Sequence, residues 1–483
     1  MSRAEQLSLS KIYTECMGMY EDEKPRFLAL LEEHIDLDAL VPHTFTRHFY
    51  AWTGRRRKYP LTAFIWALLL QRVLSIPTDS LLINFLRLSK ETRDFCGFAK
   101  VPDASKFTRF KQRFLPELRQ MFDSLVDLTE PICQSIDPAL AAMTIFDTSG
   151  IEAYVAENNP KYADNIIRRL KNYKKAKGLD DSFDPYKAAY GSMPPHAAKE
   201  PAVKQLYING HFCYVYKFGM VTNGLGIVRD VELFDEPFLK EHPEIAVEKK
   251  SDSPDEDKSL ADSKAVIPVL SDFFRKHPSI GPKVFLGDSA FDTADIYHHL
   301  FHTLHFEKAY IPLNERSKLE NADCPVNEDG IPCCPRDPRL PMKPEGGERL
   351  LRCGLPAFKF VCPKMKWVQV DGKSKRRTFC EDPCTGSPCG RMVYVYPEKD
   401  LRACPGTLRG TPEWDETYKT RSAVEKSINQ FKSSFCVAGR KTQNGQTLHA
   451  DLLLSGITQL ISVILADKIH QYQFIRTLKP LIA

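Results

Sequence analysis

The pattern of apolar and polar residues divides the chain into a helical first part and a mixed second part. Through residue 138, apolar residues recur at spacings of three and four, the period of amphipathic helices, most clearly over residues 61–70, 78–98 and 105–136. At Ala139 the pattern changes to short apolar and alternating runs that are interspersed with helical stretches. We therefore predict an all-α domain over residues 1–138.

The second part predicts strands joined by both a hairpin and helices. Strands are expected at residues 142–147, 211–221, 225–234, 284–286 and 306–313, and helices at 263–276 and 291–305. Asn223-Gly224, between the second and third strands, is a strong hairpin signal. Strands mixed with helices in this order favour an α/β fold with a mixed sheet, whose first part we place at residues 139–314.

Residues 315–410 differ in composition from the rest of the chain. They hold nine of the 14 cysteines and many Pro and Gly residues, with few long periodic runs. We interpret this stretch as a Cys-rich insertion. Residues 414–435 and 447–472 then have the pattern of two long helices, so residues 411–475 are expected to complete the core.

Composition indicates a globular protein with local basic clusters. Of 483 residues, 43% are hydrophobic and 27% are charged, and 67 Lys and Arg against 62 Asp and Glu give a net charge of +5. Basic residues nevertheless gather at 47–58, 100–113, 168–177 and 432–441. Such clusters suit a polyanion, because each neutralised phosphate releases counterions. Two of them lie in residues 1–138, which we expect to form a helical DNA-binding domain. The alternative for any one cluster is a solvated surface.

Nothing in the apolar pattern predicts a membrane protein. The longest apolar stretch, residues 452–466, contains Ser and Gln and falls short of the roughly 20 apolar residues that span a bilayer, so we expect a buried helix there. The first 20 residues lack the apolar region of a secretory signal. We therefore expect a cytoplasmic protein whose cysteines are thiols or metal ligands.

Three acids are candidates for one catalytic site. Asp147 ends the first predicted strand, Asp288 follows the strand at 284–286, and Glu425 lies in the helix at 414–435. Acids at the ends of adjacent strands can converge with one from a helix packed across them. Three clustered carboxylates repel one another unless cations bind, and hard oxygen ligands favour Mg²⁺ or Mn²⁺. Two such ions would serve phosphodiester chemistry. For a single acid after a strand, a turn or helix cap is the simpler explanation.

The helix at 414–435 carries a polar stripe beside an apolar one. At about 100° per residue, Tyr418, Arg421, Glu425 and Lys432 fall within roughly 60° of one another. The apolar stripe can pack on the sheet, and the cations beside the acid would hold the phosphates of a DNA strand. The alternative is a solvated face with an Arg421–Glu425 ion pair.

These residues carry a family resemblance that extends over about residues 40–475. The spacing Tyr-x2-Arg-x3-Glu-x6-Lys, matched by Tyr418, Arg421, Glu425 and Lys432, resembles the signature of the DDE transposases of bacterial insertion sequences. Asp147-Thr148 resembles the first-acid motif of that group, and the stretch from Gly287-Asp288 to Phe291-Asp292 resembles the second. Similar enzymes carry an insertion where this chain has its Cys-rich segment.

The resemblance implies a fold, a reaction and a set of partners. It implies a ribonuclease H-like core in which Asp147, Asp288 and Glu425 bind two Mg²⁺ or Mn²⁺ ions. It implies nicking at the element ends, followed by attack of a 3′-hydroxyl on target DNA, with Tyr418, Arg421 and Lys432 contacting the end DNA. Its partners would be double-stranded DNA, both terminal inverted repeats and target, and a second copy of the chain. A location at the bacterial nucleoid follows.

Two further features of the insertion allow alternatives. Cys362, Cys380, Cys384 and Cys389 are candidate ligands for a structural Zn²⁺, although no pair has the common x2 spacing and free thiols are the simpler interpretation. Trp367 is the only Trp of the insertion. Related enzymes stack a flipped base on an aromatic residue of the insertion, but packing within the insertion is the favoured role for Trp367.

Three activities remain open from the sequence. The first is a metal-dependent transposase, and the second is a ribonuclease H-like nuclease without strand transfer. The third is a DNA-binding protein with an inactive core, although all three acids are present. A zinc hydrolase built on His298 and His302 is disfavoured, because no Glu lies between them as in His-Glu-x-x-His.

Overall fold

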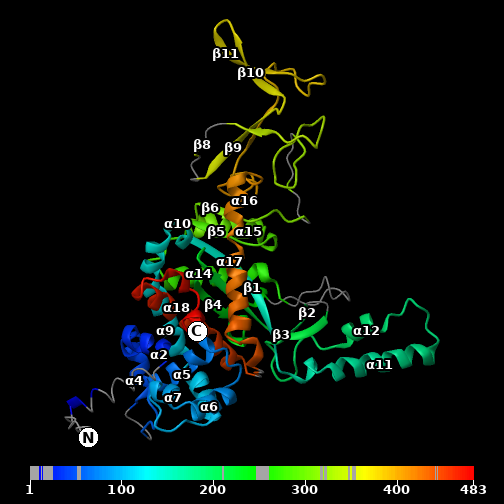
Figure 1. Ribbon diagram of the computed structural model, residues 1–483. Helices are drawn as coiled ribbons and strands as arrows, with labels where there is room; N and C mark the ends of the chain where they lie inside the picture. Colours follow the sequence, from blue (N-terminus) through cyan, green and yellow to red (C-terminus); the bar gives the residue numbers. More distant parts are fainter. Residues whose placement is uncertain are drawn as a thin grey trace, which may run out of the picture.

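A helical region, a central α/β core and a strand-rich module follow one another along the molecule (Figure 1). The computed structural model describes residues 10–11, 14, 25–51, 56–208, 211–245, 260–315, 319, 324–345, 349–350, 355–440, 442 and 444–482. Two members of the basic clusters, Arg55 and Lys441, lie outside the described residues.

The first part of the described chain is helical, as predicted. Its helices are α2 (Arg26–His34), α3 (Leu37–Leu40), α4 (His43–Phe49), α5 (Leu61–Val73), α6 (Asp79–Leu88), α7 (Lys90–Phe95), α8 (Ala104–Arg113), α9 (Leu115–Ile136) and α10 (Pro138–Ala141). The single helix predicted at 105–136 is wrong, because α8 and α9 meet at Phe114. Pro116 explains the break, since proline lacks an amide donor and suits the first turn of a new helix.

The core sheet combines antiparallel and parallel strands. Its strands are β1 (Met143–Glu152), β2 (Lys204–Ile208), β3 (His211–Thr222), β4 (Val228–Leu233), β5 (Val284–Leu286) and β6 (Lys308–Tyr310). The order is β4-β3-β1-β5-β6, with β2 on the other half of β3. The first three strands are antiparallel, and β5 and β6 run parallel to β1. This is a ribonuclease H-like arrangement, so the predicted fold and the Asn223-Gly224 hairpin are confirmed.

Helices pack around this sheet. They are α13 (Glu236–Glu241), α14 (Asp262–Lys276), α15 (Ala294–His298), α16 (Pro412–Lys419), α17 (Ser422–Asn429) and α18 (Gly445–Lys468). Helix α17 contacts β1 and β3, and α18 contacts β4, α9, α5 and α8. Helix α18 is long and apolar enough to cross a membrane, but its apolar stretch is wholly buried in the protein. The buried helix predicted at 452–466 is confirmed.

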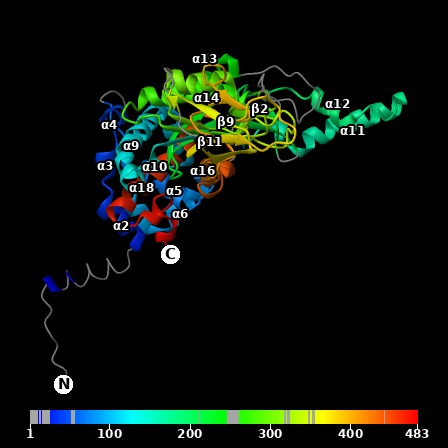
Figure 2. The same ribbon diagram turned by 90° about the horizontal axis from the view of Figure 1, so that it is seen from above.

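An arm and a module extend from the core. The arm consists of α11 (Pro160–Lys177) and α12 (Pro185–Ser192), which project to one side (Figures 1 and 2). The module holds β7 (Lys343–Pro344), β8 (Arg349–Leu350), β9 (Pro356–Val361), β10 (Met365–Val370), β11 (Lys373–Thr378) and β12 (Met392–Val395). Strands β7, β8, β9 and β12 form one small sheet, and β10 and β11 form a separate hairpin.

The helix predicted at 414–435 is divided into three pieces. Helices α16 and α17 are followed by a π-helical turn at Gln430–Ser434. Between α16 and α17, the amides of Thr420 and Arg421 bond to carbonyls three residues back, not four. This tighter winding explains the break, and apolar spacing alone cannot distinguish it from a regular helix.

Candidate active site

The register of the sheet places Asp147 beside Asp288. Ile145 of β1 pairs with Leu286 of β5 in parallel register, and each Asp follows its paired residue by two positions. Strand β5 ends at Leu286, but β1 continues to Glu152 because β3 pairs with it along that stretch. Asp147 therefore lies within β1, and the prediction that it ends the strand is wrong.

Each aspartate has one oxygen held by the next residue of the chain. The amide of Thr148 donates to Oδ1 of Asp147 at 2.8 Å. The amide of Ser289 donates to Oδ1 of Asp288 at 2.6 Å. The second oxygen, Oδ2, is thereby oriented in both residues. At Gly287 a Cβ would lie 2.8 Å from the Phe291 ring, which explains the glycine before Asp288.

Arg421 joins the three predicted acids. Its Nη2 lies 3.5 Å from Oδ2 of Asp147 and 3.6 Å from Oδ2 of Asp288, so these two oxygens are at most about 7 Å apart. Its Nη1 donates to Oε1 of Glu425 one turn along the helix. The structure thus brings all three acids around one guanidinium. The Arg421–Glu425 ion pair that the sequence offered as an alternative is present as part of this cluster.

Burial and mutual repulsion shape the electrostatics of the cluster. Burial raises the pKa of Asp147, and the charges of Asp288 and Glu425 raise it further, whereas the Thr148 amide and Arg421 lower it. Burial, assisted by the nearby acids, raises the pKa of Tyr418 to about 12. Tyr418 is therefore a neutral phenol at neutral pH, able to donate a hydrogen bond.

Tyr418 precedes Arg421 along the chain and lies near the three acids, whereas Lys432 follows Arg421 and contacts β1 beyond Asp147. The Tyr418 ring stacks on Trp414, with ring centroids 4.7 Å apart. Nζ of Lys432 lies 3.3 Å from Oγ of Ser149, which is two positions beyond Asp147 and on the same face of β1. Burial lowers the pKa of Lys432, and the charge of Lys217 lowers it further.

The three carboxylates are suitable ligands for a hard cation, but their side chains are not placed around a common metal position. Among the described residues, no group of three or more His, Cys, Asp or Glu is placed to hold a metal ion. Instead, the positive charge within the carboxylate cluster belongs to Arg421. Three carboxylates fit Mg²⁺ or Mn²⁺ by chemistry, provided that the guanidinium withdraws.

Asp292 and Arg402 tie the insertion to the core. Asp292 is buried, and both of its oxygens accept from Arg402, at 3.1 and 2.6 Å. The amide of Asn314 also donates to Asp292, at 2.9 Å. Asp292, the second acid in the stretch from Asp288 to Asp292, is therefore part of a structural ion pair with Arg402. Sequence reasoning missed Arg402, because its partner lies 110 positions away and no local spacing links them.

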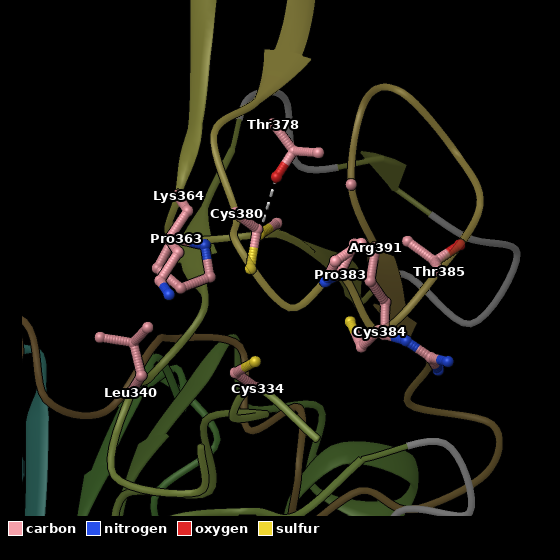
Figure 3. A pocket seen from close by; sticks show the side chains of 12 residues that line it. Cys334, Leu340, Pro363, Lys364, Thr378, Cys380, Pro383, Cys384, Thr385 and Arg391 are labelled. Carbon is pink, nitrogen blue, oxygen red and sulfur yellow. Dashed lines mark hydrogen bonds between the residues drawn. The ribbon is translucent and has the colours of Figure 1, made fainter. Parts of the chain in front are cut away.

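Four cysteines of the insertion line one small cavity. Figure 3 shows Cys334, Cys380 and Cys384 at this cavity, which measures about 10 Å³ and also borders Cys362. Cys389, the fourth residue of the predicted zinc set, is not among its lining residues. The zinc prediction stays a prediction, and elemental analysis of the purified protein tests it.

Two other predicted features are resolved by exposure. The rings of His298 and His302 lie 4.8 Å apart at a tilt of 57°, and both residues are exposed, His298 at the end of α15 and His302 in the π-helical turn that follows it. Trp367 is 58% exposed on β10, under the guanidinium of Arg376 at 4.8 Å. Trp367 therefore packs on a neighbouring side chain of the module, as its favoured role predicts, but it is more than half exposed and not buried there.

A family model and a solved structure are similar to this chain. Residues 18–113 match the family described as a transposase domain (DUF772). No curated protein matches the chain. Among solved structures, the cryo-EM structure of a piggyBac transposase synaptic complex with hairpin DNA aligns over 96% of this chain and 80% of that chain, at 11% identity and a TM-score of 0.35. The family match at residues 18–113 supports a transposase role for the chain.

Proposed function

We propose that this chain is a metal-dependent DNA transposase that cleaves the ends of an insertion sequence and joins them to target DNA. The observation that carries the proposal is the convergence of Asp147, Asp288 and Glu425 on one positive charge within a ribonuclease H-like sheet. The transposase-domain match at residues 18–113 supports the same proposal from a separate part of the chain.

The reaction consists of two displacements at phosphorus. In the first, water attacks an end phosphodiester, and the P–O3′ bond breaks to leave a 3′-hydroxyl and a 5′-phosphate. In the second, that hydroxyl attacks a target phosphodiester, so one P–O bond forms as another breaks. Two divalent ions held by Asp147, Asp288 and Glu425 would activate the attacking oxygen and stabilise the leaving oxygen.

The remaining side chains would orient the DNA. Arg421 exchanges its carboxylate partners for a phosphate of the end DNA, which keeps its charge paired in both states. The neutral Tyr418 donates a hydrogen bond to the same strand, and Lys432 contacts a phosphate further along. We propose a homodimer on DNA, because two element ends must be joined to one target.

Cleavage of the DNA that flanks the coding region tests the catalytic assignment. We expect cleavage that requires Mg²⁺ or Mn²⁺. Asp147→Asn, Asp288→Asn and Glu425→Gln should each reduce it to the metal-free background while leaving DNA binding intact. Glu416→Gln is the matched control, because Glu416 is an exposed acid of α16 paired only with Lys419 in the structure described. Three variants that each cleave at the wild-type rate would refute the assignment.

A joining assay with pre-cleaved ends separates the alternatives. Joined products support strand transfer, whereas cleavage without joining identifies a ribonuclease H-like nuclease. Binding without cleavage in any divalent ion identifies an inactive DNA-binding protein.

A further inference from the structure

A basic hollow opens between α4, α5 and α8 in the helical region. Its volume is about 730 Å³, within the range of pockets that hold whole ligands. Six cations line it: Arg56, Arg57, Lys58, Lys106, Arg109 and Arg113. These residues come from two basic clusters about 50 positions apart in the sequence, which the fold brings together at one surface.

The hollow concentrates positive charge without compensation. Among the described residues that line it, none is Asp or Glu. Burial lowers the pKa of Arg57, and the charge of Arg113 lowers it further, as expected where like charges crowd. Lys111 of the same sequence cluster behaves differently, because it is buried and paired with Asp79 and Asp451. The fold therefore separates a structural cation from exposed ones.

The guanidinium of Arg57 packs on buried aromatic rings of the hollow. The guanidinium of Arg57 lies 4.9 Å from the centre of the Phe49 ring and 5.4 Å from that of Phe114. Nε of Arg57 also donates to the carbonyl of Phe49 at 3.0 Å. These contacts fix one charge in the hollow before any partner arrives, which lowers the entropy cost of binding.

We propose that this hollow, lined by the six cations, binds the phosphate backbone of duplex DNA. A single small anion would satisfy one or two cations, whereas a phosphodiester strand presents a charge at every nucleotide. The inference rests on the proposed function and assigns to the helical region the DNA contact that holds the substrate away from the carboxylate cluster.

Salt-dependent binding by full-length Arg109→Gln/Arg113→Gln tests the inference. Both side chains are exposed on α8, so folding is retained, which circular dichroism checks. The slope of log affinity against log salt should become less steep by about two, and affinity at 50 mM salt should fall roughly a hundredfold. Arg87→Gln/Lys90→Gln is the matched control, since it removes two exposed cations from the same region outside the hollow.

Two duplexes and one competitor distinguish the sources of phosphate. A loss that is equal on mixed-sequence and element-flanking duplexes supports general backbone contact, and a larger loss on the flanking duplex supports contact with the element ends. An unchanged slope, or an equal change in the control, overturns the inference. Displacement of DNA by inorganic phosphate at constant ionic strength also overturns it. Because Asp147→Asn should bind normally, loss of cleavage alone bears on the proposed function and not on the hollow.

Discussion

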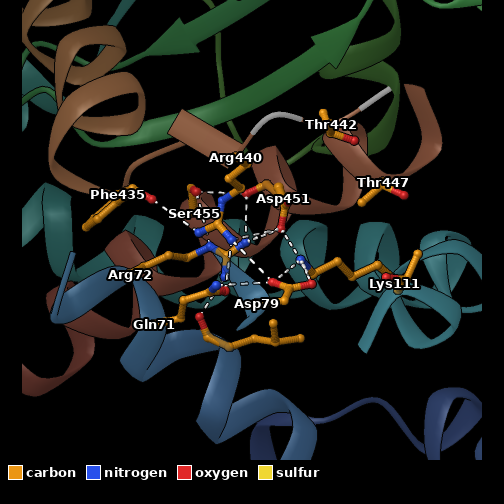
Figure 4. Close-up of polar contacts among 12 residues, drawn as sticks. Gln71, Arg72, Asp79, Lys111, Phe435, Arg440, Thr442, Thr447, Asp451 and Ser455 are labelled. Carbon is orange, nitrogen blue, oxygen red and sulfur yellow. Dashed lines mark hydrogen bonds and ion pairs between the residues drawn. The ribbon is translucent and has the colours of Figure 1, made fainter. Parts of the chain in front are cut away.

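Asp451 holds together a buried group of charges drawn from distant parts of the chain (Figure 4). Its carboxylate lies 2.8 Å from Nη2 of Arg72 and 2.9 Å from Nζ of Lys111, with Nη1 of Arg440 at 3.6 Å. Lys111 also contacts Asp79 at 2.9 Å. Burial alone would raise the pKa of Asp451, but the charges of Arg440, Lys111 and Arg72 together lower it to about 2.

Replacing Asp451 with Asn should destabilise the protein by about 3–5 kcal/mol, because it leaves buried cations without their shared partner. The folded pKa lies below the ordinary value of 3.8, so the charge of Asp451 contributes stability that is present above about pH 4 and lost as the pH falls to about 2. Urea unfolding should therefore show that the difference in the free energy of unfolding between the wild type and Asp451→Asn decreases by about 2 kcal/mol as the pH falls from about 4 to about 2. A difference that does not change with pH would contradict this account.

For single residues, the sequence predicted which acids lie close together better than it predicted the contacts between their side chains and others. The positions of Asp147 and Asp288 at predicted strand ends and of Glu425 on a predicted helix indicated that the three acids could converge, and the structure brings them together. The sequence did not predict that Arg421 would lie among the acids, because helical angles give a direction but not a rotamer. The Asp292–Arg402 pair could not be predicted from the sequence, since a contact across 110 positions leaves no local pattern.

Helix α18 packs so closely on α9 that one position excludes a side chain. A Cβ at Gly456 would lie 2.4 Å from the ring of Phe122, which is fully buried. Gly456→Ala should cost about 1–3 kcal/mol through overpacking, even though Ala favours helices by about 1 kcal/mol. Gly281→Ala is the control, because its Cβ would meet open space, and it should leave stability nearly unchanged. Equal melting temperatures for the two variants would contradict the packing argument.

The segment from α16 to the π turn at Gln430–Ser434 shows what periodicity can and cannot predict about an element. Val424, Ile428, Phe431 and Phe435 are buried, as their spacing indicated. The tight turn before α17 winds the chain more per residue than an α-helix does, and the π turn at Gln430–Ser434 winds it less. The two deviations change the helical angle in opposite directions, and Lys432 contacts Ser149, two positions beyond Asp147 on β1, although the helix is not continuous.

For the whole molecule, the sequence pattern divided the chain into a helical region, a core and an insertion, whereas the fold packs parts of these segments against one another. The change of pattern at residue 139 and the cysteines of 315–410 located a helical region and an insertion from the sequence. The pattern could not reveal that α18, which follows the insertion, is enclosed by helices from the first 138 residues. Nor could it reveal that the arm at α11 has no buried side chain among its described residues, although it is a regular helix.

Removing the helical region and shortening the β10–β11 hairpin should therefore have opposite effects on stability. A chain that begins at residue 139 loses α5, α8 and α9, which exposes the apolar surface of α18 and removes Arg72 and Lys111 from Asp451. We expect it to bind a hydrophobic dye and to lose cooperative unfolding in calorimetry. Met365 and Thr378 face each other across the β10–β11 hairpin, and none of residues 366–377 is buried. Replacing those residues with Asn-Gly should join the two strands by a tight turn and leave the melting temperature unchanged. If the chain from residue 139 melted cooperatively, the helical region and the core would be independent units, and the charges around Asp451 would be an interface between domains instead of part of one core.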